Sequence, residues 1–346
     1  MKRTILGLAV AALAAACGRA PSGPATLAVM THDSFSVSEA VVDAFEQETG
    51  AQLQFLQAGD AGTALNRAIL AGERPLADVF YGVDNTFLSR ALEEDIFEAY
   101  ESPVLEAIPD EYELDPSHRA LPVDYGDVCL NYDISYFEAN DLAVPASLED
   151  LTRPEYRGLL VVENPATSSP GLAFLLATIG HFGDDGYLRF WEALRENDVL
   201  VVNDWEAAYT GEFSGASAQG TRPLVVSYGS SPPFEVLYAE PPVDEPSTGA
   251  ITADDTCFRQ IEFVGILKGT QQRSLAERWV DFMLSVPFQE DMPIQMFVFP
   301  VHPQAALDPT FEAFLAIPEK PAWVPPEDIA ANRERWIEEW TEVVLR

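Results

Sequence analysis

The apolar positions between residues 26 and 81 mark three candidate strands. Residues 26–31 and 77–81 form short apolar runs, whereas Leu53 and Phe55 alternate with glutamines. Continuous runs are typical of strands buried on both faces, and strict alternation is typical of a strand buried on one face. The sequence therefore predicts two buried strands and, between them, one half-buried strand.

Helix-type spacing fills the gaps between these strands. The expected helices run from the cap Ser38 to Gly50, around Leu65 and Ile69, and from about Thr86 to Ala99. Serine is favoured before the first helical residue and glycine after the last. Strands and helices that alternate in this way imply a mostly parallel sheet with helices on both faces.

The middle of the chain repeats this pattern. Residues 159–162, 200–202 and 224–228 predict three further strands, and a helix begins near Pro170. Residues 326–346 have the pattern of an acidic amphipathic helix. The sequence thus predicts two α/β lobes.

The N-terminal residues have the composition of an export signal. Lys2 and Arg3 precede a short apolar run, and small residues lead directly into Cys17. The run is shorter than the roughly 20 apolar residues that span a bilayer. We expect residues 1–16 to be a lipoprotein signal peptide, Cys17 to be lipidated, and residues 17–25 to form a tether. The alternative is an ordinary secretory signal cleaved nearby; either predicts a protein that works outside the cytoplasm.

Two apolar stretches, residues 128–132 and 258–267, are candidates for strands that cross between the lobes. Cys129 and Cys257 would then lie on neighbouring strands, at the separation that a disulfide needs. A remaining pair of cysteines in an exported protein favours a bridge. The alternative is two separate buried thiols.

The charge balance excludes some partners. The chain has 56 acidic and 20 basic residues and a net charge of −36, which becomes −38 without Lys2 and Arg3. General nucleic-acid binding needs a basic surface, so we expect no nucleic-acid partner. Contact with an anionic membrane would need the lipid anchor.

Acidic and hydroxyl side chains follow the predicted strands of the first lobe. Ligands of open α/β sheets bind beyond the carboxyl ends of the strands. The residues in that place are Asp33, Ser34, Asp60 and Asp84, and Asp124 precedes the first candidate crossing strand. Each aspartate taken singly is best explained as a helix cap. Together, the carboxylates would suit a cation.

The second lobe supplies hydroxyl groups and aromatic rings. Residues 164–171 lie between a strand and a helix, where hydroxyls and free N–H groups form an anion site. Capping by Ser169 alone is the alternative. Residues 228–232 end another strand in the same style. Trp205, Phe234 and Phe297 are candidate walls of a ligand site, with burial in the core as the alternative.

Enzyme signatures are missing from the sequence. It contains no Gly-x-Ser-x-Gly, His-Glu-x-x-His or Cys-x-x-Cys pattern, and its four histidines are scattered. We therefore expect a binding protein with no catalytic residue, no metal ligand and no cofactor.

Several segments also form a pattern by their order and spacing. They are Thr31–Phe35, Ala77–Val79 with Gly82, Asp84 and Asn85, Asp124–Gly126, Asn164–Leu172, Trp205–Tyr209, Ser227–Pro232, and Arg335–Ile337 with Trp340. This pattern resembles the thiamine-binding proteins of bacterial thiamine ABC transporters, which are two-lobed periplasmic solute-binding proteins.

The resemblance implies a type II periplasmic binding protein fold, in which each lobe is a mixed, mostly parallel sheet flanked by helices. The ligand would lie in the cleft between the lobes. The expected boundaries are residues 26–124 plus about 262–302 for lobe 1, and residues 125–261 plus about 303–346 for lobe 2.

The resemblance also implies a ligand, partners and a contact set. The ligand would be thiamine or thiamine phosphates, delivered by a monomer to the permease and ATPase subunits of an ABC importer. Carried over by position, the contacts would be Asp60, Ala61, Ser168, Ser169, Trp205, Tyr228, Gly229, Ser230, Ser231 and Pro232. The rival interpretations are a receptor for a polyamine or ferric iron, and an exported phosphatase that acts on thiamine esters.

Overall fold

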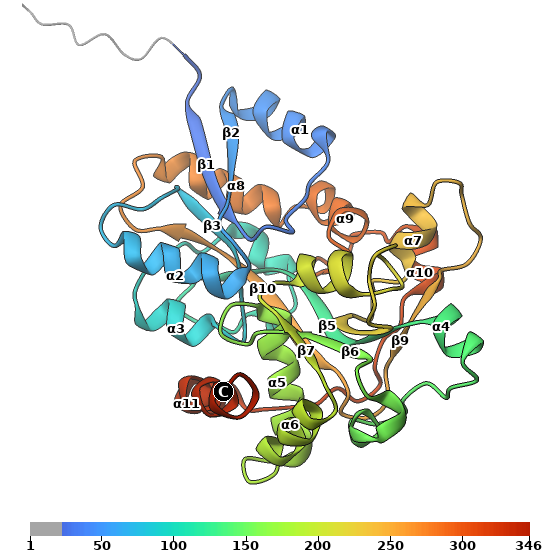
Figure 1. Ribbon diagram of the computed structural model, residues 1–346. Helices are drawn as coiled ribbons and strands as arrows, with labels where there is room; N and C mark the ends of the chain where they lie inside the picture. The colour runs from blue at the N-terminus through green and yellow to red at the C-terminus, as the bar shows by residue number, and fades with distance from the viewer. Residues whose placement is uncertain (1–22) are drawn as a thin grey trace, which may run out of the picture.

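The computed structural model describes residues 23–346 as a curled sheet with helices packed on both faces (Figure 1). The predicted signal peptide and Cys17 lie outside the described residues, so their roles stay predictions. The strands are β1 (Thr26–Thr31), β2 (Gln52–Gln57), β3 (Val79–Asp84), β4 (Phe97–Glu98), β5 (Leu121–Asp133), β6 (Leu160–Glu163), β7 (Leu200–Val202), β8 (Leu224–Tyr228), β9 (Thr248–Ile251), β10 (Phe258–Leu267) and β11 (Phe299–Pro300).

Helices connect and cover these strands. They are α1 (Glu39–Thr49), α2 (Ala61–Ala71), α3 (Leu88–Glu93), α4 (Ile134–Ala139), α5 (Ser169–Phe182), α6 (Tyr187–Glu196), α7 (Pro233–Tyr238), α8 (Arg273–Met283), α9 (Val286–Gln295), α10 (Pro309–Phe314) and α11 (Pro326–Val344). A π-helical turn, η5, spans Ala207–Glu212. None of the described helices is long and apolar enough to cross a membrane.

The first part of the sheet contains the expected parallel strands. β1 pairs in parallel with β2 and with β3. β3 is buried along its whole length, because α1 and α8 lie on one face of the sheet and α2 and α3 lie on the other (Figure 1). Tyr81 accordingly packs in the cluster that holds Trp279 of α8, and Phe80 packs in the cluster that holds Leu65 of α2.

Strands β5 and β10 join the two parts of the sheet. They pair antiparallel, with Val128 opposite Phe258. The second half of β10 pairs with β3, and the second half of β5 pairs with β8. The prediction that these segments cross between lobes is therefore confirmed, and the strand order is β2-β1-β3-β10-β5-β8-β6-β7.

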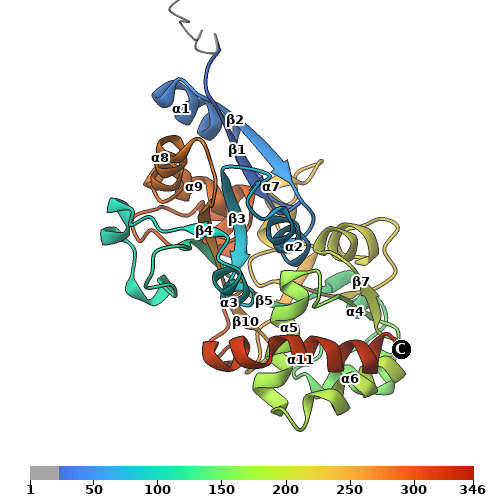
Figure 2. The same ribbon diagram turned by 90° about the vertical axis from the view of Figure 1, so that its left-hand side faces the viewer.

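The second part of the sheet is enclosed by α5, α6 and α11. Helix α5 is buried from Ser169 to Ile179, because it lies between the sheet and α6. Figure 2 shows α11 running beside α6. Trp340 of α11 meets Trp191 of α6 edge to face, with ring centroids 5.5 Å apart. The amphipathic helix predicted at the C-terminus is thus confirmed, and its buried stripe includes Trp336, Trp340 and Val344.

One predicted helix is wrong in its length. The segment expected to be helical from about Thr86 to Ala99 contains only α3, and the chain then enters β4. Asp95 adopts a left-handed conformation with φ of 53°, which ends the helical path. Phe97 then pairs with β10 and is buried. Pairing with a distant strand thus overrides the local helical pattern.

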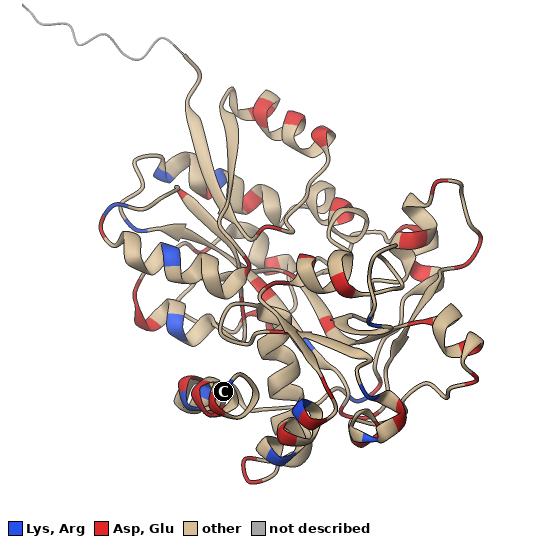
Figure 3. Cartoon of the chain, viewed as in Figure 1, with Lys and Arg blue, Asp and Glu red and all other residues tan. Residues whose placement is uncertain are grey.

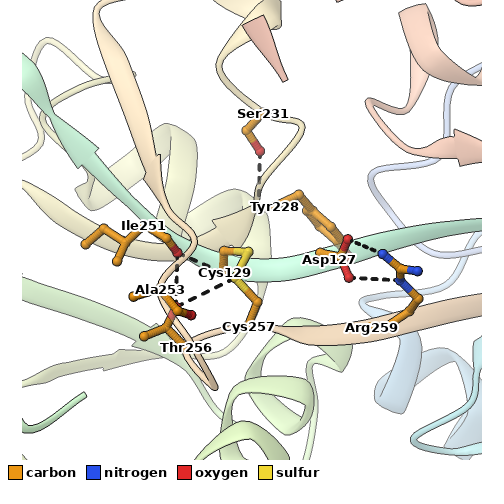
Figure 4. The surroundings of a disulfide bond; sticks show 9 residues. All are labelled: Asp127, Cys129, Tyr228, Ser231, Ile251, Ala253, Thr256, Cys257 and Arg259. Atoms are coloured by element: carbon orange, nitrogen blue, oxygen red, sulfur yellow. Dashed lines mark hydrogen bonds and ion pairs between the residues drawn. A yellow bond between two sulfur atoms is a disulfide. The ribbon is translucent and has the colours of Figure 1, made fainter. Parts of the chain in front are cut away.

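Cys129 and Cys257 are joined by a disulfide, as their predicted positions on neighbouring strands implied (Figure 4). Their Cα atoms are 4.3 Å apart, and both side chains are fully buried. The neighbouring Thr256 hydroxyl donates a hydrogen bond to the carbonyl oxygen of Ala253 at 2.7 Å and lies 3.3 Å from that of Ile251. The bridge therefore fastens β10 to β5 at the start of β10.

Acidic side chains are distributed over helices and loops throughout the described chain, rather than gathered on one element (Figure 3). Interspersed Lys and Arg residues form surface ion pairs, such as Arg335 with Asp184 and Glu339. Most of the negative charge is therefore solvated surface, which favours solubility and identifies no ligand.

Candidate ligand-binding site

A cavity of about 320 Å³ lies where the strand ends of both lobes meet. The described residues that line it are His32, Ser34, Ser36, Asp60, Ala61, Ser169, Pro170, Trp205, Glu206, Tyr209, Thr210, Tyr228, Ser231, Phe234, Gln260, Glu262, Gln295, Met296, Phe297 and Val298. The cavity is large enough for a small organic molecule.

The structure brings together nine of the residues singled out in the sequence. Ser34, Asp60, Ala61, Ser169, Trp205, Tyr228, Ser231, Phe234 and Phe297 all line the cavity. They come from the ends of strands and the starts of helices, which is where ligands of α/β sheets bind.

Seven other predicted residues do not line the cavity: Asp33, Asp84, Asp124, Ser168, Gly229, Ser230 and Pro232. Several of them have structural roles at its margin. Asp33 accepts a hydrogen bond from the backbone N–H of Gly59 at 2.9 Å. A Cβ on Gly229 would lie 2.2 Å from the carbonyl oxygen of Ala316, so only glycine fits there.

Asp84 and Asp124 are part of strands rather than of the loops that follow them. The prediction ended the third strand at Tyr81, but β3 continues to Asp84, and Asp124 lies inside β5. The Asp84 carboxylate accepts hydrogen bonds from the backbone N–H and the hydroxyl of Thr86, in the turn before α3, so it is not the cap of that helix. Burial raises the pKa of Asp84 to about 7.

Asp60 connects the two lobes at one edge of the cavity. Its Oδ1 atom accepts a hydrogen bond from Ala61 N at 2.7 Å and so caps α2. Its Oδ2 atom accepts one from Trp205 N at 3.1 Å, in the loop after β7. Burial raises the pKa of Asp60. One side chain therefore both faces the cavity and fixes the position of Trp205.

Trp205 and Tyr209 form an aromatic wall. Their rings are stacked, with centroids 5.0 Å apart and planes inclined by 14°. The Trp205 indole N–H donates to Ser227 Oγ at 3.0 Å, and Ser227 Oγ lies 3.0 Å from Ser231 Oγ. The orientation of the indole is therefore held by hydrogen bonds as well as by packing.

Phe234 and Phe297 form a second aromatic pair, with centroids 4.9 Å apart and planes inclined by 79°. Phe297 has a φ of 57°, which is strained for a bulky residue. The buried Ser230 hydroxyl donates a hydrogen bond to the Phe297 carbonyl oxygen. Ser230 therefore supports the aromatic wall from behind, although it does not line the cavity.

Gln260 of β10 connects groups from both lobes, and our sequence analysis did not identify it. Its Oε1 atom accepts from the Tyr228 hydroxyl at 2.9 Å. Its Nε2 atom donates to Asp84 Oδ2 at 2.7 Å and to Ser169 Oγ at 2.8 Å. The hydroxyl at the start of α5 is thus already engaged.

Glu262 of β10 is another lining residue that the sequence analysis did not identify. It is 6% exposed, and its Oε1 atom lies 3.6 Å from His32 Nε2. Gln260 and Glu262 flank Ile261 in a strand that is apolar from Phe263 to Leu267. Two polar residues at i and i+2 point to one face of a strand, so this alternation could have identified both.

The polar lining is acidic. It includes the carboxyl groups of Asp60, Glu206 and Glu262, and none of the described lining residues is lysine or arginine. Burial lowers the pKa of His32 despite the nearby carboxylates. Aromatic faces beside carboxylates attract a flat cation, because both the ring quadrupole and the charge favour it.

The described residues do not form a metal site: no group of three or more His, Cys, Asp or Glu side chains among them could hold a metal ion. The acidic cavity therefore differs in chemistry from a closed metal cage. Its carboxyl groups are separated by aromatic and hydroxyl side chains.

Comparison with known proteins agrees with this geometry. Residues 74–332 match the family model described as bacterial extracellular solute-binding protein. The thiamine-binding periplasmic protein of Salmonella typhimurium is 30% identical over 92% of this chain and 94% of its own length. That of Escherichia coli is 29% identical over the same shares of the two chains.

Solved structures share the architecture. A periplasmic thiamin binding protein superposes with a TM-score of 0.82 and 27% identity, over 95% of this chain and 99% of the other. The ferric binding protein from Campylobacter jejuni superposes with a TM-score of 0.72 at 20% identity, over 92% and 99%. The chain therefore belongs to the bacterial extracellular solute-binding proteins and has their two-lobed type II periplasmic binding protein fold.

Proposed function

We propose that this protein is an extracytoplasmic receptor that captures thiamine, and more weakly its phosphate esters, for an ABC importer. The observation that carries the proposal is the cavity, which combines aromatic walls with three carboxyl groups and has no basic side chain among its described lining residues. Thiamine offers a flat, permanently charged thiazolium ring and a flat aminopyrimidine. The names of the relatives support the same ligand.

The interaction energies available in this cavity are sufficient for tight binding of such a ligand. A carboxylate about 4 Å from the thiazolium contributes up to ~4 kcal/mol at an effective dielectric constant near 20, before desolvation. A cation over an aromatic face contributes roughly 0.5–2 kcal/mol. A micromolar to nanomolar binder needs about −8 to −12 kcal/mol. Burial of the two rings between the lobes would supply the remainder.

The proposed contacts follow the cavity lining. Trp205, Tyr228, Phe234 and Phe297 would enclose the rings, and Asp60 would lie along the ligand. Ser169, at the start of α5, would meet the hydroxyethyl end. Ser168, Gly229, Ser230 and Pro232 would shape the same loops from behind the lining.

The cellular setting is part of the proposal. The signal-like N-terminus and the periplasmic names of the relatives support export. We propose that Cys17 carries a lipid anchor, that residues 17–25 tether the receptor, and that it works as a monomer with permease and ATPase subunits. Release of the intact protein from cell membranes by a Cys17→Ser substitution would test the anchor.

Isothermal titration calorimetry with thiamine tests the proposed ligand directly. We expect saturable binding with one thiamine per chain, and no competition by spermidine. Absence of saturable binding at high micromolar thiamine would refute the proposal. Incubation with thiamine monophosphate should release no phosphate, and turnover would favour the phosphatase interpretation instead.

A further inference from the structure

Behind the cavity-lining Glu262 lies a buried tyrosine shared by two carboxyl groups. The Tyr81 hydroxyl lies 2.7 Å from Asp124 Oδ2 and 3.0 Å from Glu262 Oε2. All three side chains are buried. A tyrosine hydroxyl has one hydrogen, so it can donate to only one of the two carboxyl groups. The other contact is a hydrogen bond only if that carboxyl group carries a proton and donates it to the tyrosine oxygen.

The surroundings indicate which carboxyl group holds this proton. Asp124 is fully buried, and its Oδ1 atom has no hydrogen-bond partner. Glu262 reaches the cavity, with its Oε1 atom on the side of His32. An unpaired charge costs most where it is farthest from water. In the favoured arrangement, therefore, the protonated Asp124 donates a hydrogen bond to the Tyr81 oxygen, and the Tyr81 hydroxyl donates one to Glu262. The negative charge is then on Glu262.

Other titratable groups face this cluster from each neighbouring element. His32 follows β1, Asp84 ends β3, Asp60 begins α2 and Tyr228 ends β8. None of the described lysine or arginine side chains forms an ion pair with Asp124 or Glu262. Burial raises the pKa of both carboxyl groups, and the charge of Glu262 raises that of Asp124 further. The nearest titratable base is His32, whose Nε2 atom lies 3.6 Å from Glu262 Oε1 and whose pKa is lowered by burial. The cavity thus has an acidic group that no lysine or arginine among the described residues neutralises.

We propose that Glu262 is the carboxylate that receives the positive charge of the ligand, and that Tyr81 and Asp124 are positioning residues that place this charge at the cavity. In a fraction of the molecules without ligand Glu262 is protonated as well as Asp124, because burial raises its pKa. A bound cation favours the ionised form of Glu262, so this second proton passes from Glu262 to solvent on binding. Binding of thiamine is therefore coupled to proton release. This inference rests on the proposed function. It adds that Glu262 is the residue that determines specificity for a cation, and that binding of the cation is accompanied by release of a proton.

Calorimetry in two buffers with different ionisation enthalpies counts the protons released per ligand. For the wild-type protein we expect a measurable fraction of one proton per thiamine, which increases as the pH is lowered from about 8 to about 5. Glu262→Gln should bind thiamine at least tenfold more weakly and release no proton from this cluster. Tyr81→Phe should weaken binding less and change the pH at which release occurs.

Two controls separate recognition of charge from loss of structure. Asp281→Asn removes a carboxylate that accepts a hydrogen bond from the Tyr100 hydroxyl at 2.9 Å, outside the cavity, and should leave both measurements unchanged. A thiamine analogue with an uncharged thiophene ring in place of the thiazolium tests charge recognition on the wild-type protein itself. The wild-type protein should bind this analogue at least tenfold more weakly than it binds thiamine, without proton release. Glu262→Gln should bind the analogue and thiamine with equal affinity.

The outcomes distinguish this inference from the proposed function. Thiamine binding with no proton release, or with unchanged affinity in Glu262→Gln, would overturn the inference and leave the receptor function intact. If thiamine does not bind, the same titrations with 3-benzyl-4-methylthiazolium decide the inference. Binding that depends on Glu262 would support it, and no binding of either cation would overturn both.

Discussion

Replacement of Trp205 by alanine is expected to weaken thiamine binding by about 10- to 100-fold. Trp205 lines the cavity and stacks on Tyr209, with ring centroids 5.0 Å apart. After truncation, Tyr209 would remain as a lining ring, but its centroid lies 5.0 Å from the position of the lost indole. The loss is therefore not compensated by the residue behind.

The magnitude follows from two contributions. Contact between the indole face and a cation contributes roughly 0.5–2 kcal/mol to the binding free energy. Loss of about 40 Å² of apolar contact adds ~1 kcal/mol at about 25 cal/mol per Å². The total of ~1.5–3 kcal/mol corresponds to roughly 10- to 100-fold in affinity. Trp205→Phe should cost less, because it keeps a ring and loses only the hydrogen bond to Ser227, worth about 1 kcal/mol.

Calorimetric titration of thiamine into the wild-type protein and the two variants provides the test. Trp323→Ala is the matched control, because Trp323 is 71% exposed and does not line the cavity. It should leave the dissociation constant unchanged. An unaltered titration for Trp205→Ala, in a variant that melts like the wild-type protein, would remove Trp205 from the site and refute the stacking argument.

Three further predictions concern stability and specificity. Because the disulfide closes a separation of 128 residues, Cys129→Ala with Cys257→Ala should lower the free energy of unfolding by about 2–5 kcal/mol in denaturant titrations. Glu163 is buried with no hydrogen-bond partner for either carboxylate oxygen, and burial raises its pKa well above the usual value. Its folded pKa exceeds its unfolded pKa, so stability should fall as pH rises above about 4, and Glu163→Gln should raise the melting temperature at pH 8 more than at pH 5. Thiamine diphosphate should bind at least tenfold more weakly than thiamine in competition assays, because none of the described lining residues is a lysine or arginine that could pair with its phosphates; equal affinity would contradict this.

Local pattern was sufficient for most elements of the fold. β1 and α1 begin and end where the apolar run, Ser38 and Gly50 predicted. The short α3 was not predictable, since its end depends on the pairing of Phe97 with Leu267 and of Glu98 with Ile266, far along the chain. A local window contains no information about such a partner.

The site was predictable only where it coincides with strand ends. Asp60, Trp205 and Tyr228 follow that rule and line the cavity. Asp124 and Glu262 do not follow the strand-end rule, because both lie within strands that cross between the lobes. Whether a carboxyl group inside such a strand faces a cavity or the core depends on what packs above it.

The sequence by itself determined the alternating strands and helices, the two crossing strands and the family, because these depend on periodicity and on motifs along the chain. Tertiary structure decided which acids face the cavity, which are capped or buried, and that Tyr81 lies between Asp124 and Glu262. The physical reason is that a charge takes its chemistry from its neighbours in space. Those neighbours come from β1, β3, β5 and β10, which only the folded sheet brings together.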